Sequence, residues 1–139
     1  MRTRAHYNQE EVDDRHLRVK KAFAALRKQG IYTRQNFWCC QTCAGAALGQ
    51  YFGTPKGLKW RGYAYWHQQD NVHARTGEAF YLAFGTTKDG DEEAGSKVGA
   101  DVVAALRAEG VSVSWDGSKH TRICIDEAVA RYVAQGVAI

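Results

Sequence analysis

The sequence lacks any apolar stretch approaching the ~20 residues needed to cross a bilayer. Its mean hydropathy of −0.49 agrees with that absence, and together they exclude a transmembrane helix. The segment from Met1 to Glu11 is polar and has no apolar run of the kind found in secretory signal peptides. We therefore expect a cytoplasmic protein with no membrane partner.

Proline is almost absent, with one residue, Pro55, among 139. No internal repeat and no linker-like segment divides the chain, which favours a single domain over residues 1–139. Aromatic residues are plentiful by contrast, with 4 Trp, 7 Tyr and 5 Phe. They supply more apolar surface than a disordered polar chain carries, so the composition indicates one folded domain.

Net charge is low, at a formal +4, but it is unevenly distributed. Residues 1–34 hold nine Lys and Arg against four Asp and Glu. Such a segment can attract nucleic acid, but no base-reading motif accompanies it. We expect these side chains, including Arg15, Lys20 and Lys28, to point mostly toward water on one helix. Nucleic acid is therefore a possible but not a favoured partner.

Helical periodicity is clearest near the start of the chain. One side of a 3.6-residue period carries Val12, His16, Val19, Phe23 and Leu26. This pattern predicts an amphipathic helix over about residues 9–29. We expect His16 to lie at the edge of the core with a hydrogen-bond partner.

Local patterns predict the remaining elements. In chain order they are a helix at 36–53, strands at 60–69 and 79–86 joined by a polar loop at 70–77, a helix ending at Gly110, strands at 111–115 and 121–125, and a helix at 127–135. The predicted class is α+β, in the order α-α-β-β-α-β-β-α. We expect a sheet of about four mostly antiparallel strands, with helices mainly on one face.

Three cysteines gather at the predicted start of the second helix. Cys40 and Cys43 are three residues apart and Cys39 and Cys43 four apart, so either pair can share a helix face. A thiol in the first turn of a helix has a lowered pKa. The simplest interpretation is that at least two of these cysteines are small buried hydrophobic residues.

Two further roles for this cluster are redox exchange and zinc binding. Cys40-x-x-Cys43 has the spacing of a dithiol redox motif, but the predicted element order lacks the β-α-β context of such motifs. Cys40 and Cys43 could supply half of a zinc site, with His67, Cys39, His73, His120 or Cys124 as the source of the other ligands. A second closely spaced ligand pair is missing from the sequence, so we expect no metal and no cofactor.

A catalytic role is also open to the cysteines. One of Cys39, Cys40 and Cys43 could act as a nucleophile, with His67 as the base and Asp70 or Gln69 orienting it. All the residue types that a cysteine-dependent hydrolase or transferase needs are therefore present. The hydrogen bond that defines a nucleophile and its base is not visible in a sequence.

Polar residues also close the first aromatic strand, where Tyr65 is followed by His67, Gln69 and Asp70. Polar groups at a strand end can hold a ligand through hydrogen bonds and stacking. A hydrogen bond between His67 and Asp70 that only anchors the next loop fits the pattern equally well. Trp38, next to the cysteines, is a further candidate for ligand contact.

Short motifs are spread over much of the chain. They are N-F-x-C-C-x-T-C at 36–43, H-x-Q-D at 67–70, F-G at 84–85, W-D-G at 115–117 and R-I at 122–123. In combination they resemble a widespread bacterial family known only as a domain of unknown function, over about residues 15–126. The resemblance implies that Trp115 and Arg122 belong to the same pattern as the cysteines, and it brings no activity, substrate or cofactor.

We therefore predict a non-enzymatic binding or interaction module for a protein or a small molecule. A small regulatory inhibitor of a larger protein or nucleic-acid machine is a special case of this prediction. Small size, aromatic content and the lack of a complete catalytic signature support it. The alternatives are the cysteine-dependent enzyme and a structural zinc site. The predicted contact residues are Trp38, Tyr65, His67, Gln69, Asp70, Trp115 and Arg122.

Overall fold

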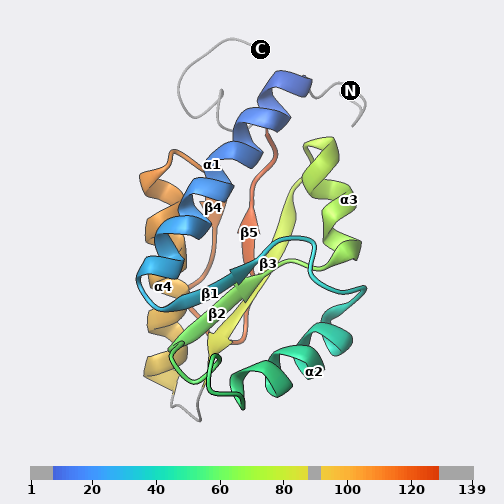
Figure 1. The fold of residues 1–139 in the computed structure, drawn as a ribbon. Coiled ribbons are helices and arrows are strands. Elements are labelled where there is room, and N and C mark those ends of the chain that lie inside the picture. The colour runs from blue at the N-terminus through green and yellow to red at the C-terminus, as the bar shows by residue number, and fades with distance from the viewer. Residues whose placement is uncertain (1–7, 88–91, 129–139) are drawn as a thin grey trace.

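Five strands and four helices make up the computed structural model, which describes residues 8–87 and 92–128 (Figure 1). In chain order they are α1 (Gln9–Lys28), β1 (Ile31–Arg34), α2 (Gln41–Phe52), β2 (Gly62–Tyr65), α3 (Gln68–Thr76), β3 (Phe80–Thr86), α4 (Glu92–Ala108), β4 (Val113–Ser114) and β5 (Ile123–Ile125). The predicted α+β class is confirmed. None of the described helices is long and apolar enough to cross a membrane.

The sheet is mixed and has the strand order β1-β2-β3-β5-β4. β1 pairs in parallel with β2, from Ile31 opposite Gly62 to Arg34 opposite Tyr65. The other neighbouring strands are antiparallel. The sheet is therefore mostly antiparallel, as predicted, but has one strand more, because the short segment Ile31–Arg34 pairs as a strand.

The parallel pairing makes β1, α2 and β2 a β-α-β unit in which α2 is the crossover. The element order expected from the sequence lacked this unit, and that expectation was wrong. In such a unit the carboxyl ends of both strands lie at the same edge of the sheet. The loop after β1 and the loop after β2 consequently start side by side.

The two faces of the sheet belong to different cores. Ile31, Ala64 and Leu82 belong to the larger core, together with buried residues of α1 and α4. Their sequence neighbours Tyr32 and Ala83 belong to a smaller core with residues of α2. This alternation is the period of a β-strand. It places α1 and α4 on one face and α2 on the other.

Arg15 of α1 is buried, contrary to the expectation from the sequence. The helix begins after Asn8, whose side chain accepts a hydrogen bond from the Glu10 N–H, and its buried side includes Val12, Arg15 and Val19. Arg15 is 2% exposed, whereas His16 is exposed. The expected outward position of Arg15 and core-edge position of His16 were therefore wrong.

Backbone carbonyls from distant segments explain why an arginine can be buried there. The Arg15 guanidinium donates to Glu78 O at 2.9 Å and Asp126 O at 2.8 Å, and to Ala74 O at 3.2 Å. Hydrogen bonds of this kind offset the cost of removing a charge from water. Arg15 thus joins α1 to the end of α3, the start of β3 and the residue after β5.

The segment predicted as the polar loop 70–77 forms most of α3. His67 is the N-cap residue, and Gly77, with a φ of 94°, ends the helix in the left-handed region. The loop prediction failed because few apolar residues mark a buried side, and Ala74 is the buried apolar residue of this helix. The helix predicted at 127–135 lies almost wholly outside the described residues, as does the start of the basic segment 1–34.

Candidate functional site

Two loops meet where β1 and β2 end. The Phe37 N–H donates to Trp66 O at 2.8 Å, and the Gln68 N–H donates to Trp38 O at 2.9 Å. These bonds continue the pairing of β1 and β2 beyond the strands themselves. They hold the loop that carries the cysteines against the loop that leads into α3.

The cysteine loop reverses direction through an unusual backbone. Asn36 and Trp38 have φ angles of 49° and 62°, in the left-handed region that non-glycine residues seldom adopt. Phe37, between them, is buried and packs edge-on against Tyr65 at 5.7 Å. Such backbone strain collects at functional sites. Here it turns Trp38 outward, 51% exposed, just before the cysteines.

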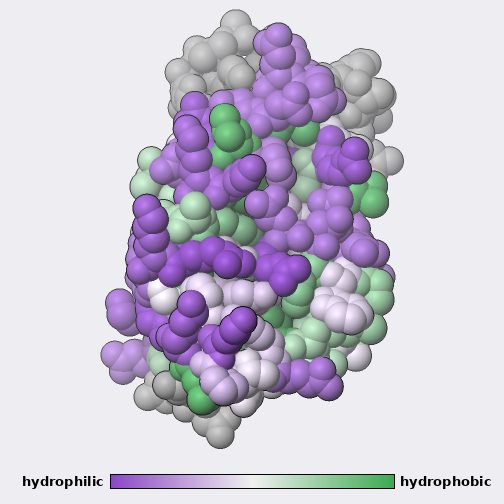
Figure 2. All heavy atoms as spheres, viewed as in Figure 1, coloured by the Kyte–Doolittle hydropathy of each residue, from purple (hydrophilic) through white to green (hydrophobic). Residues whose placement is uncertain are grey.

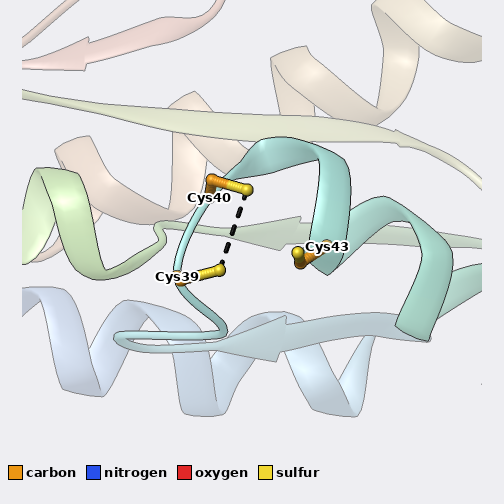
Figure 3. A group of neighbouring side chains, drawn as sticks. All are labelled: Cys39, Cys40 and Cys43. Atoms are coloured by element: carbon orange, nitrogen blue, oxygen red, sulfur yellow. Dashed lines mark hydrogen bonds between the residues drawn. The ribbon is translucent and has the colours of Figure 1, made fainter.

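Three free thiols converge at this loop (Figure 3). Cys39 and Cys40 lie on the loop and Cys43 lies in the first turn of α2. Their sulfur atoms all lie within 4.8 Å of one another, and the Cys39 and Cys40 sulfurs are 3.8 Å apart. Cys39 and Cys43 are exposed and Cys40 is half-buried, so the cluster is open to solvent and ligands.

The thiols of Cys40 and Cys43 differ in pKa. The backbone N–H of Cys43 lowers the pKa of Cys40, with smaller effects from the Cys43 and Cys39 thiols. The pKa of Cys43 is raised to about 11, because hydrogen bonds to the sulfurs of Cys39 and Cys40 and their negative charge disfavour another thiolate. Cys40 is therefore the more easily ionised of this pair.

His67 and Asp70 form a buried pair at the start of α3. His67 is 6% exposed, and its Nε2 lies 3.4 Å from Asp70 Oδ2. Its Nδ1 is buried and has no hydrogen-bond partner in the described part of the chain. Asp70 also accepts hydrogen bonds from the Tyr81 N–H and from Arg122, each at 3.3 Å. The carboxylate therefore ties α3 to β3 and to the residue before β5.

A pocket of about 440 Å³ joins the two clusters. It lies between the first turns of α2 and α3, next to Arg122. Its lining includes Cys40, Thr42, His67, Gln69, Asp70 and Arg122. Five of these six residues are among the candidates named from the sequence, and Thr42 belongs to the same cysteine motif.

Residues 2–131 match the family model DUF6891, a domain of unknown function. The chain belongs to this family. The predicted membership of a family of unknown function is thus confirmed. No curated protein and no solved structure matches the chain.

Other predicted contacts of this DUF6891 domain lie outside that pocket. The Trp115 ring packs edge-on against Phe84 at 5.5 Å, and its N–H donates to Ser118 O and Thr121 O, each at 3.0 Å. These contacts close the loop between β4 and β5. Tyr65 is 3% exposed, and burial raises its pKa to about 12.

The structure assembles neither the predicted cysteine–histidine catalytic pair nor the predicted zinc ligand set in full. Among the described residues no hydrogen bond joins Cys40 to His67, whose Nε2 faces Asp70. The group of mutually close metal-ligating atoms contains Cys39, Cys40 and Cys43 and not His67. From the sequence only Cys40 and Cys43 formed a close ligand pair, with Cys39 one of several possible further ligands; in the structure Cys39 lies beside them.

His73 also lines the pocket; from the sequence it was a candidate only as a further zinc ligand. It lies on α3, six residues after His67, in a segment interpreted as a loop. Its Nδ1 lies 3.3 Å from Glu78 Oε1.

Proposed function

We propose that this domain binds a thiophilic metal ion, with zinc as the reference case, through Cys39, Cys40 and Cys43. The observation that carries the proposal is the gathering of three sulfurs within 4.8 Å. In a tetrahedral site with Zn–S bonds of about 2.3 Å, neighbouring sulfurs lie about 3.8 Å apart. The Cys39 and Cys40 sulfurs are already 3.8 Å apart, so small side-chain rotations complete the set.

Three protein ligands leave one position of a tetrahedral ion open to water or to a ligand. Cys40 is the member of the cluster that lines the 440 Å³ pocket, beside His67 and Arg122. The proposal thus takes up the zinc-site alternative and departs from the predicted binding of a protein or a small molecule without a metal. Free thiols persist in reducing compartments, which supports a cytoplasmic location.

Metal titration with single substitutions tests this proposal. The metal-free chain is titrated with Co²⁺ under reducing, anaerobic conditions, and Zn²⁺ is then added as a competitor. The wild type should take up one ion and show the absorption of a tetrahedral thiolate complex. Cys39→Ser, Cys40→Ser and Cys43→Ser should each weaken binding by at least about tenfold, the smallest loss typical when a hydrogen bond supporting a metal ligand is removed.

Cys124→Ser is the matched control, because Cys124 lies on β5 and outside the sulfur cluster. It should bind metal like the wild type. Equal affinity in the wild type and in a variant lacking all three clustered thiols would mean that the metal binds elsewhere, and the proposal would be abandoned.

Dithiol–disulfide exchange is a second candidate, favoured by the position of Cys40-x-x-Cys43 between a strand and the helix of a β-α-β unit. In that reaction the Cys40 thiolate attacks a substrate disulfide and releases one substrate thiolate. Cys43 then attacks the mixed disulfide and releases the second, leaving a Cys40–Cys43 disulfide and a reduced substrate.

Cys39 distinguishes the two candidates. Exchange with oxidised glutathione needs Cys40 and Cys43 alone, so Cys39→Ser should react like the wild type and Cys43→Ser should accumulate the mixed disulfide. Metal binding needs all three thiols. Loss of metal binding in Cys39→Ser therefore supports the metal site, and unchanged metal binding together with rapid exchange supports the redox candidate.

A further inference from the structure

A second pocket, of about 300 Å³, lies between α1 and the edge strand β1. Lys20 and Arg27 of α1 and Arg34 of β1 line it, and none of its lining residues is Asp or Glu. Among the described residues, none of these three cations forms an ion pair. Figure 2 shows strongly hydrophilic residues over this part of α1 and β1.

Neutral groups hold the two arginines in place. Arg27 donates from Nε and Nη2 to Thr33 O, at 3.2 and 2.6 Å, and its guanidinium lies 5.0 Å from the Tyr32 ring centre. Arg34 donates from Nη1 to the Tyr32 hydroxyl at 2.8 Å and lies 4.6 Å from the Phe37 ring centre. These contacts fix the side chains without neutralising them, which lowers the entropy cost of binding an anion.

Protection of the exposed edge of the sheet explains the position of Arg27 but not those of Lys20 and Arg34. By occupying the Thr33 carbonyl, Arg27 blocks the free edge of β1 against pairing with another strand. That role needs neither Arg34 nor Lys20. Among the other described cations of residues 1–34, Arg15 is buried and Arg18 pairs with Asp14 at 2.9 Å. Lys21 and Lys28 are exposed and do not line the pocket. Lys20, Arg27 and Arg34 are the cations of this segment that come together at one pocket.

We propose that the pocket between α1 and β1 binds a phosphate group. A planar guanidinium presents paired N–H donors that match two phosphate oxygens, and a lysine adds a mobile point charge. Three cations without a carboxylate suit a multiply charged oxyanion better than a single carboxylate. The phosphate belongs either to a small phosphorylated molecule or to a nucleic-acid backbone. This proposal is independent of the cysteine cluster.

Binding of pyrophosphate to the full-length chain, followed by calorimetry, tests the site. Lys20→Gln and Arg34→Gln should each weaken binding by about tenfold, the equivalent of one charge-assisted hydrogen bond. Lys21→Gln is the matched control, because it removes the same charge from the next exposed residue of α1, which does not line the pocket. Arg27→Gln is avoided, since it also uncovers the edge of β1.

A single-stranded oligonucleotide separates the two sources of phosphate. If the ligand is a nucleic-acid backbone, the oligonucleotide should bind more tightly than pyrophosphate, and log K should fall with log salt at a slope of about −2 for three contacts. If the ligand is a small molecule, pyrophosphate should bind at least as well as the oligonucleotide. No binding of either probe at millimolar concentration, or equal losses in Lys20→Gln and Lys21→Gln, would overturn the proposal.

Discussion

Alkylation of the metal-free protein should separate Cys40 from Cys43 by rate. The reactive species is the thiolate, whose fraction falls tenfold for each unit by which the pKa exceeds the pH. The pKa of Cys43 is about 11 against an ordinary 9.0, so its thiolate fraction at neutral pH is about 100-fold below that of an ordinary cysteine. The pKa of Cys40 is lowered, so Cys40 should react first.

The neighbouring thiols raise the pKa of Cys43, so removing one of them should lower it. Cys43 stays protonated until the pH approaches 11, because Cys39 and Cys40 hold its proton by hydrogen bonds and repel its negative charge. In Cys40→Ser one of those neighbours is lost, so the pKa of Cys43 should fall back toward 9.0. Its alkylation at neutral pH should then accelerate, by less than about 100-fold, because Cys39, the larger cause of the shift, remains.

Timed labelling with iodoacetamide, followed by proteolysis and mass spectrometry of the cysteine peptides, measures these rates. Cys124 is the internal reference, because burial raises its pKa and Cys40 is not among the causes of that shift. Its rate should not change in Cys40→Ser. The reasoning would be refuted if Cys43 reacted as fast as Cys40 in the wild type, or if the substitution left the rate of Cys43 unchanged.

Two further predictions concern the fold. Arg15→Met should lower the free energy of unfolding by about 2 kcal/mol or more, because at least two buried carbonyls lose their donor. Lys21→Met, at an exposed position of α1, should change it by less than about 0.5 kcal/mol; similar urea midpoints for both variants would contradict this. Gly99→Ala should cost about 1–3 kcal/mol, since its Cβ would lie 2.6 Å from Trp115. Unchanged stability and tryptophan fluorescence in that variant would show that the contact is looser than described.

Local patterns predicted the elements that have a clear apolar side. α1 was placed within a residue or two because Val12, Val19, Phe23 and Leu26 mark its buried side. Its period did not decide whether position 15 or 16 faces inward. That choice depends on the carbonyls of Glu78 and Asp126, which no local pattern contains.

The two halves of the candidate site could be found in the sequence, but the strand pairing that brings them together could not. Cys40 and His67 lie in separate motifs, and the parallel pairing of β1 with β2 brings their loops to one edge of the sheet. β1 is four residues long, too short for a distinct strand pattern. The place of Cys39 in the sulfur cluster likewise follows from the left-handed backbone at Trp38.

X-ray absorption at the zinc edge of the zinc-loaded chain tests the central claim most directly. Three sulfur neighbours at about 2.3 Å and one nitrogen or oxygen neighbour at about 2.0–2.1 Å are expected if Cys39, Cys40 and Cys43 bind the ion and one position stays open. A coordination shell made of nitrogen and oxygen alone, or a sulfur signal that persists when all three clustered cysteines are replaced by serine, would contradict the account.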